Sequence, residues 1–257
     1  KFALYLTPEM KARLERRYTE DGSRSLTGFI ENAINFYLDY LSANNSGLFL
    51  PSAVQSYLDE AAARFGDHKA VIFQNLTLTY RQLKDKAEAF AASLREHGLN
   101  SGDRVAIMLP NLPQTIIAFW GALKAGATVV MTNPLYMEKE IVANMQDSGA
   151  EHMILLDMLW PRIDALRDRL PLRNFIVTSA ADSLSFPLNW LYKLKKRRSN
   201  KAPIPYDNKN VFAWQSFCKG ARRYAAPIAD PQRDPIMLQY TGGTTGLPKG
   251  VVLTHAN

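Results

Sequence analysis

The residue types best suited to chemistry gather in one short stretch near the end of the chain. It supplies three threonines, three glycines and one lysine: Thr241, Gly242, Gly243, Thr244, Thr245, Gly246 and Lys249. Glycines allow close backbone approach and left-handed conformations, so successive N–H groups can form a concave anion site. The threonine hydroxyls add donors and the lysine adds positive charge. The stretch therefore predicts a polyphosphate-binding loop, with an ordinary Gly/Thr-rich turn as the alternative.

This arrangement differs from the common phosphate loop of kinases and GTPases. That loop needs Gly, Lys and Ser/Thr in direct succession, whereas Lys249 lies between Pro248 and Gly250. Every position from Thr241 to Gly250 instead resembles the phosphate loop of the adenylate-forming enzyme superfamily.

Three further segments resemble the same superfamily. They are residues 78–83 (LTYRQL), 121–127 (GALKAGA) and 133–136 (NPLY). Together with their surroundings they are most similar to the bacterial long-chain fatty-acid–CoA ligases, over residues 48–257. Luciferases, aryl-CoA ligases and the adenylation domains of peptide synthetases share the phosphate loop, so the loop alone does not distinguish these substrates.

The resemblance implies an enzyme that activates a fatty acid in two steps. ATP and the carboxylate form an acyl-adenylate and pyrophosphate, and the adenylate then reacts with the thiol of CoA. Thr241 and Lys249 would serve as catalytic residues, because with Mg²⁺ they would stabilise the departing phosphates. The family's adenine-, ribose- and metal-binding residues would lie beyond Asn257, so we expect these 257 residues alone to be inactive.

The elements that must position the loop alternate between helix and strand. Apolar periodicity predicts helices over residues 52–65, 80–97, 112–125, 137–147 and 161–169, and strands over 70–73, 105–109, 128–131, 152–156, 174–178 and 236–240. Gly98, Gly126 and Gly149 follow three helices, where a left-handed residue ends a helix cheaply. This alternation predicts an α/β fold with a sheet covered on both faces. The resemblance implies the layered α/β sheets of the N-terminal part of adenylate-forming enzymes.

Residues 1–45 follow a different order, strand–helix–helix, and a polar linker over residues 42–47 (SANNSG) ends them. We therefore expect two domains, residues 1–45 and 46–257. The first resembles the ribbon-helix-helix fold of dimeric DNA-binding proteins. Its six basic and six acidic side chains cancel, which weakens attraction to DNA phosphates. DNA binding, homodimerisation and packing on the enzyme remain alternatives, and so does a regulator in which a ligase-derived region senses a ligand.

The formal net charge of +7 is concentrated in one part of the chain. Residues 185–223 contain ten Lys and Arg residues against one acidic residue, Asp207. Within this part, an aromatic and aliphatic run begins at Phe186 and leads directly into cations that end at Arg198. Two interpretations remain open for residues 186–198: an anchor at an anionic membrane surface, or a solvated basic loop whose aromatic side chains pack on the domain.

Composition argues against several other classes of protein. The single cysteine, Cys218, cannot form an internal disulfide, no secretory signal opens the sequence, and the longest apolar stretch is too short to span a bilayer. We therefore expect a cytoplasmic protein, and under the anchor interpretation residues 186–198 would contact the inner face of the membrane. The four histidines show no metal-ligand spacing. We expect His97 at a helix end and His255 beside the loop as a structural support.

Overall fold

The computed structural model describes residues 53–197, 203–219, 227, 230, 233–241 and 249–255. The chain divides into two units, residues 1–50 and 51–257, and every described residue belongs to the second. The predicted domain of residues 1–45 and the linker of residues 42–47 therefore lie outside the described residues. The same holds for positions 242–248 of the predicted phosphate loop.

A seven-stranded sheet forms the centre of the described unit. Its strand order is β7-β6-β5-β3-β4-β8-β9, and every neighbouring pair is parallel except β8 with β9. The strands are β3 (Arg104–Met108), β4 (Thr128–Met131), β5 (His152–Leu156), β6 (Asn174–Thr178), β7 (Val211–Ala213), β8 (Pro235–Thr241) and β9 (Lys249–Thr254). A separate antiparallel hairpin pairs β1 (Lys69–Phe73) with β2 (Leu76–Thr79).

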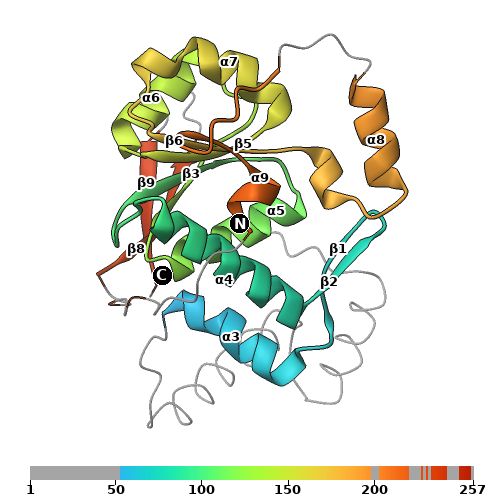
Figure 1. The fold of residues 1–257 in the computed structure, drawn as a ribbon. Coiled ribbons are helices and arrows are strands. Elements are labelled where there is room, and N and C mark those ends of the chain that lie inside the picture. Colours follow the sequence, from blue (N-terminus) through green and yellow to red (C-terminus); the bar gives the residue numbers. More distant parts are fainter. Residues whose placement is uncertain are drawn as a thin grey trace, which may run out of the picture. The chain divides into compact units, whose positions relative to one another are not determined.

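Helices cover both faces of the sheet, as Figure 1 shows. The first face carries α4 (Tyr80–Glu96), α5 (Pro113–Lys124) and the short α9 (Trp214–Phe217), and α3 (Val54–Phe65) packs against α4 and α5. The second face carries α6 (Glu138–Ser148) and α7 (Trp160–Ala165). Successive residues of β3 alternate between two separate apolar cores, with Ile107 in one and Met108 in the other. The predicted α/β sheet, covered on both faces, is confirmed.

Glycines end three of these helices as predicted. The φ angle is +90° at Gly98, +84° at Gly126 and +61° at Gly149. These angles lie in the left-handed region, which glycine adopts without a steric penalty. After α5, the N–H groups of Gly126 and Ala127 donate to carbonyls in the last helical turn, both at 2.9 Å. The chain can therefore turn sharply from α5 into β4.

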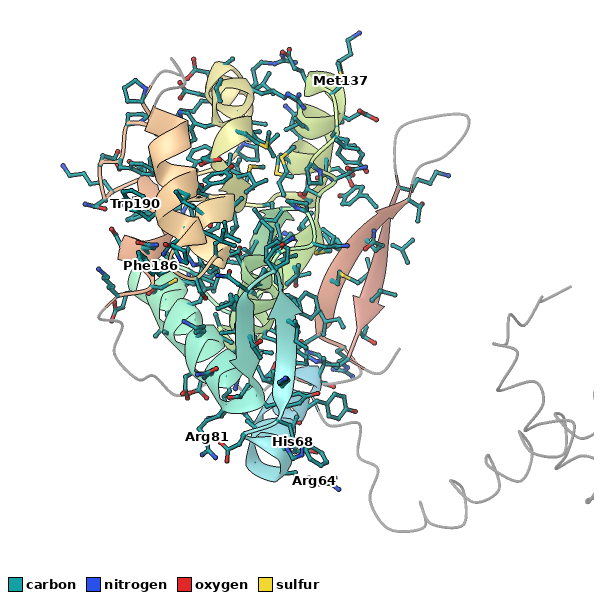
Figure 2. All side chains as sticks on the ribbon, turned by 90° about the vertical axis from the view of Figure 1, so that its right-hand side faces the viewer. Arg64, His68, Arg81, Met137, Phe186 and Trp190 are labelled. Atoms are coloured by element: carbon teal, nitrogen blue, oxygen red, sulfur yellow. The ribbon has the colours of Figure 1, made fainter. Side chains whose placement is uncertain are left out.

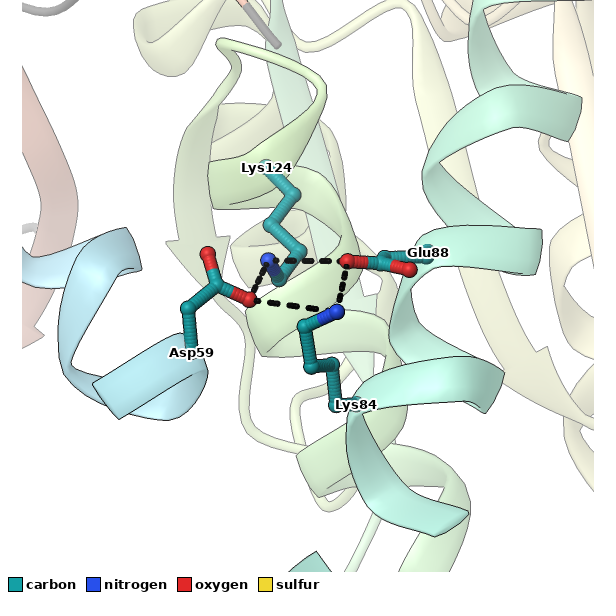
Figure 3. Close-up of polar contacts among 4 residues, drawn as sticks. All are labelled: Asp59, Lys84, Glu88 and Lys124. Carbon is teal, nitrogen blue, oxygen red and sulfur yellow. Dashed lines mark hydrogen bonds and ion pairs between the residues drawn. The ribbon is translucent and has the colours of Figure 1, made fainter. Parts of the chain in front are cut away.

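Four charged residues join α3, α4 and α5 (Figure 3). The side chain of Lys124 is only 6% exposed, and its Nζ lies 2.6 Å from Asp59 Oδ1 and 3.5 Å from Glu88 Oε1. Lys84 completes the group, 2.9 Å from Glu88 and 3.8 Å from Asp59. Burying an ammonium without opposite charges is costly, so the group favours one arrangement of the three helices.

The structure differs from the sequence-based expectation in several elements. The predicted helix over residues 161–169 is shorter, because α7 ends at Ala165 and a 3-10 turn, η2 (Arg167–Arg169), follows. The strand over residues 70–73 has a hairpin partner, β2, that was not predicted, and β9 begins at Lys249, inside the expected loop.

The structure also contradicts one of the two interpretations of the basic segment that begins at Phe186. Residues expected there as a solvated loop form a helix, α8 (Leu188–Arg197), which follows the 3-10 turn η3 (Ala180–Ser183). The loop interpretation was wrong because apolar and basic residues in this segment recur at helical spacing. Among the helices of the described part of the chain, none has the length and apolarity needed to cross a membrane.

Candidate functional site

Thr241 and Lys249 lie opposite each other at the loop end of the β8–β9 hairpin. The two strands pair from Pro235↔Thr254 to Thr241↔Lys249, with one irregularity near Pro235. The residues between them lie outside the described part of the chain, including the predicted site residues Gly242, Gly243, Thr244, Thr245 and Gly246. The structure thus brings the predicted threonine and lysine together where the loop leaves and re-enters the sheet.

The loop end of the hairpin lies at the carboxyl edge of the parallel strands. Gln239 pairs with Met131, the last residue of β4, so Thr241 extends two residues beyond that strand. The chain leaves β3 for α5 on one face of the sheet and leaves β4 for α6 on the other. In open α/β sheets, ligands bind where neighbouring connections diverge in this way, at the carboxyl ends of the strands. The topology therefore favours a binding site beside the loop.

Both described residues of the predicted site are exposed. Within the described ranges, no carboxylate forms an ion pair with Lys249. A lysine that is exposed and not neutralised by a carboxylate can attract an anion, and the Thr241 hydroxyl can donate to one. The described residues contain no group of three or more His, Cys, Asp or Glu side chains that could hold a metal ion.

Tyr240 anchors β8 immediately before the loop. Its side chain is buried, and its hydroxyl donates to Asp147 Oδ2 on α6 at 2.6 Å. Burial raises the pKa of the Tyr240 hydroxyl, and the hydrogen bond and charge of Asp147 raise it further. The hydroxyl therefore remains a protonated donor at neutral pH. Sequence reasoning missed this pair, because 93 positions separate the two residues and no pattern links them.

Gly250 gives the Tyr240 ring room on the other strand of the hairpin. The two residues are cross-strand partners, and a Cβ at position 250 would lie 3.0 Å from Tyr240 Cζ. Glycine in a strand often marks such a close approach. The last glycine of the predicted motif thus has a packing role, which differs from that expected of the loop glycines.

The NPLY segment lies at the same edge, directly after β4. Asn133 Oδ1 accepts the N–H of Leu135 at 2.9 Å, and Glu140 Oε2 accepts the N–H of Met137 at 2.7 Å where α6 begins. The side chains of Leu135 and Met137 are exposed, and Figure 2 shows Met137 pointing outward. Because β4 and β8 are neighbours, this segment and the hairpin emerge next to each other. Two segments that carry the family resemblance therefore converge here.

The other two segments that carry the resemblance form helix ends away from this edge. Thr79 Oγ1 accepts the N–H of Gln82 at 3.3 Å, while Gln82 Oε1 accepts the N–H of Thr79 at 3.0 Å, which makes a capping box at the start of α4. The segment 121–127 contains Lys124, which ends α5 and belongs to the charged group, and the left-handed Gly126 that follows the helix. Both segments support the fold.

His255 does not lie beside the loop, so that prediction was wrong. It follows β9 at the end where Thr254 pairs with Pro235, and the loop joins the strands at the opposite end. Its Nδ1 accepts the N–H of Val54 at 2.8 Å, which connects the end of β9 to the start of α3. The predicted role as a structural support is confirmed. The position of His97 at the end of α4 is confirmed as well.

Comparison with known families and sequences gives consistent matches. A family model described as AMP-binding enzyme matches residues 58–257. A long-chain-fatty-acid–CoA ligase of Bacillus subtilis is 42% identical over 207 residues, which cover 79% of this chain and 37% of that protein. One from Escherichia coli O6:H1 is 36% identical over 217 residues, or 80% and 38% of the two chains. This chain therefore spans less than two fifths of the length of these relatives.

Two solved structures share the fold. An anthranilate CoA ligase in complex with anthranoyl-AMP matches with a TM-score of 0.67 and 21% identity, covering 82% of this chain and 36% of that one. A long-chain-fatty-acid–CoA ligase from Archaeoglobus fulgidus matches with a TM-score of 0.63 and 19% identity, covering 81% and 38%. The expected layered α/β architecture is thereby confirmed.

Proposed function

Because this chain belongs to the AMP-binding enzyme family, we propose that its β8–β9 hairpin holds the phosphates of ATP during the activation of a fatty acid. The supporting observation is the cross-strand pairing of Thr241 with Lys249 at the carboxyl edge of the sheet. A hydroxyl and an ammonium there flank a loop rich in glycine and threonine. Such a loop can direct several N–H groups at one anion, so the ligand that suits it best is a polyphosphate.

Lys249 and Thr241 would act on the leaving group of the first step. When a carboxylate attacks the α-phosphate of ATP, negative charge moves onto the departing β- and γ-phosphates. Donors that are already fixed near those oxygens lower the barrier without reorganising. Strand pairing fixes the backbone of both residues, and the Tyr240–Asp147 hydrogen bond holds the adjoining end of β8. Mg²⁺ bound to ATP would neutralise the same phosphates.

We propose a long-chain fatty acid as the carboxylate and CoA as the acceptor. The two relatives described above, which are named long-chain-fatty-acid–CoA ligases, support this choice. Because the matched region is less than two fifths of each relative, we expect residues 1–257 alone to bind ATP phosphates without completing the reaction. A division into residues 1–45 and 46–257 remains a proposal. The same applies to homodimerisation or DNA binding by the first of them, and to the alternative function as a regulator.

The substitution Lys249→Ala in the native protein tests the proposed role. ATP–pyrophosphate exchange measures the first step, and preformed acyl-adenylate supplied with CoA measures the second. Removing one donor from a preorganised anion site costs about 10²- to 10³-fold in rate, so we expect exchange to fall by that factor. The second step does not release pyrophosphate, and we expect it to change by less than about twofold.

A matched control is Lys209→Ala. Lys209 is also exposed, but it lies just before β7, at the sheet edge opposite β9. We expect both steps to proceed at their original rates in this variant. Equal slowing of the two steps by Lys249→Ala, or no slowing of exchange, would contradict the proposed role of the hairpin.

A further inference from the structure

The segment that leads into and forms α8 exposes an unusual concentration of large apolar side chains. The exposed fractions are 78% for Phe186, 40% for Leu188, 56% for Trp190, 49% for Leu191 and 40% for Tyr192. Single exposed apolar residues are ordinary on a protein surface, but a contiguous group indicates a contact surface. Figure 2 shows Phe186 and Trp190 at the outer flank of the molecule, on the side away from the β8–β9 hairpin.

Helical spacing divides α8 into an apolar arc and a basic arc. With 3.6 residues per turn, positions 188, 191 and 192 adjoin positions 190 and 194, and all five are Leu, Trp or Tyr. Positions 189, 193, 196 and 197 form the other arc, and they are Asn, Lys, Lys and Arg. Only Lys195 interrupts the apolar arc. A helix with this division ordinarily buries its apolar arc, yet the apolar side chains described here are exposed.

The start of α8 is fixed to the body of the protein. Asn75, in the turn between β1 and β2, donates from Nδ2 to the carbonyl of Ser185 at 3.2 Å and accepts the N–H of Ser185 at 3.1 Å. Figure 1 shows α8 next to this hairpin, at the flank of the fold. The element that α8 packs against most is η3. The helix is thus held in place at its start, while the described side chains of its apolar arc are exposed.

The charge around the helix identifies the occupant that suits this surface. Residues 185–201 contain six Lys and Arg residues and no acidic residue. A second copy docked on the same arc would bring an equal set of cations, and like charges at close range repel. An anionic bilayer would instead attract the basic arc and accept the apolar arc, with Trp and Tyr at the level of the headgroups.

We propose that Phe186 and α8 form a docking surface for bilayers that carry anionic headgroups. The helix lies in the interface, with its apolar arc toward the acyl chains and its basic arc toward the phosphates. This surface is separate from the proposed ATP site, and the proposal does not depend on ligase activity.

The tryptophans provide a direct probe of docking. Trp190 is exposed, whereas Trp160 and Trp214 are buried and Trp120 is half-buried. Entry of Trp190 into a bilayer would therefore shift the emission of the purified chain to the blue. We expect this shift, together with co-sedimentation, for vesicles of equimolar phosphatidylcholine and phosphatidylglycerol. Without anionic lipid the basic arc loses its attraction, so binding to phosphatidylcholine alone should be weaker by about tenfold or more.

Two pairs of substitutions separate the contributions of the two arcs. Trp190→Ser with Leu191→Ser removes apolar contact, and Lys196→Glu with Arg197→Glu reverses charge. Each pair should reduce co-sedimentation with the mixed vesicles by about tenfold or more. Trp190→Phe should keep co-sedimentation and lose the emission shift, which assigns that signal to Trp190.

Matched controls lie on elements other than α8. Met158→Ser removes an apolar side chain that is 62% exposed, and Arg169→Glu reverses an exposed charge on η2. Both variants should bind the mixed vesicles as the unmodified chain does. Unchanged binding by both α8 variants would overturn the proposal. So would concentration-dependent self-association without vesicle binding, because α8 would then contact a second copy.

Discussion

Two lysines in family-like segments show how differently the same charged group can be used. Lys124 ends α5 inside the layer of α3, α4 and α5, where its side chain is 6% exposed and faces two carboxylates. Lys249 begins β9 at the edge of the sheet, is exposed, and follows a loop rich in glycine and threonine. The first region neutralises its cation internally. The second leaves its cation available to a ligand.

The comparison also divides the resemblance into structural and chemical parts. The segments 78–83 and 121–127 supply a capping box, a left-handed helix end and the buried lysine of the charged group. The hairpin and the NPLY segment converge at the carboxyl edge, where ligands of α/β sheets bind. Similarity in the first pair indicates the fold, whereas similarity in the second pair lies where we propose the ligand site.

The largest effect on stability should come from removing the carboxylates that face Lys124. Asp59→Asn combined with Glu88→Gln leaves the buried ammonium without either of them. Loss of the partners of a buried charge is costly, but both carboxylates are partly exposed, so we expect a loss of about 2 to 3 kcal/mol. Lys249→Ala should change the free energy of unfolding by less than about 0.5 kcal/mol, as for most surface substitutions. Urea unfolding of the purified variants measures both.

Lys124→Met is the control that identifies the cause. It removes the buried charge and keeps an apolar side chain of similar length, so no ammonium remains to be stabilised. We expect it to cost less stability than the double neutralisation. If it costs more, the ion pairs themselves hold the helices together, and the contrast between an internally neutralised lysine and an available one would have to be revised.

A smaller effect is expected at the base of the hairpin. Tyr240→Phe removes the hydroxyl that donates to Asp147 and leaves the ring in place. Water can reach the exposed Asp147 carboxylate, so we expect a loss of about 1 kcal/mol, typical of one hydrogen bond. Tyr57→Phe, at an exposed tyrosine of α3, should change stability by much less. Equal losses for the two variants would mean that the hydrogen bond does not anchor β8.

The sequence predicted most of the elements that local patterns determine. β4, β5 and β6 have the predicted bounds, since short apolar runs between glycine-ended helices are typical of strands buried on both faces. Contacts between distant positions could not be predicted. The turn between β1 and β2 uses Gln74 at φ +52°, where no glycine marks a turn. Lys124 and Asp59 are 65 positions apart, and Tyr240 and Asp147 are 93 apart. No local sequence pattern indicates contacts between residues so far apart.

A third basic side chain, His152, extends the comparison to a group whose burial favours its neutral form. It lies at the start of β5, and its Nδ1 accepts a hydrogen bond from Asn174 Nδ2, which also donates to the carbonyl of His97. Burial lowers the pKa of His152, with the nearby charges of Asp103 and Glu151 acting in the opposite sense and those of Arg173 and His97 in the same sense. Unlike Lys124, it forms no ion pair with a carboxylate of the described residues.

The smallest effect we expect is a pH dependence of folding stability caused by His152. Because the pKa of His152 is lower in the folded chain than its ordinary value of about 6.5, the unfolded chain binds more protons as pH falls below that value. The stabilising contribution is therefore present above about pH 6.5 and is lost as pH falls through the folded pKa. In unfolding curves from pH 8 to pH 5, His152→Gln should flatten this loss, while His68→Gln, at an exposed ring, should not. If both variants keep the original slope, protonation of His152 is not what destabilises the fold in acid.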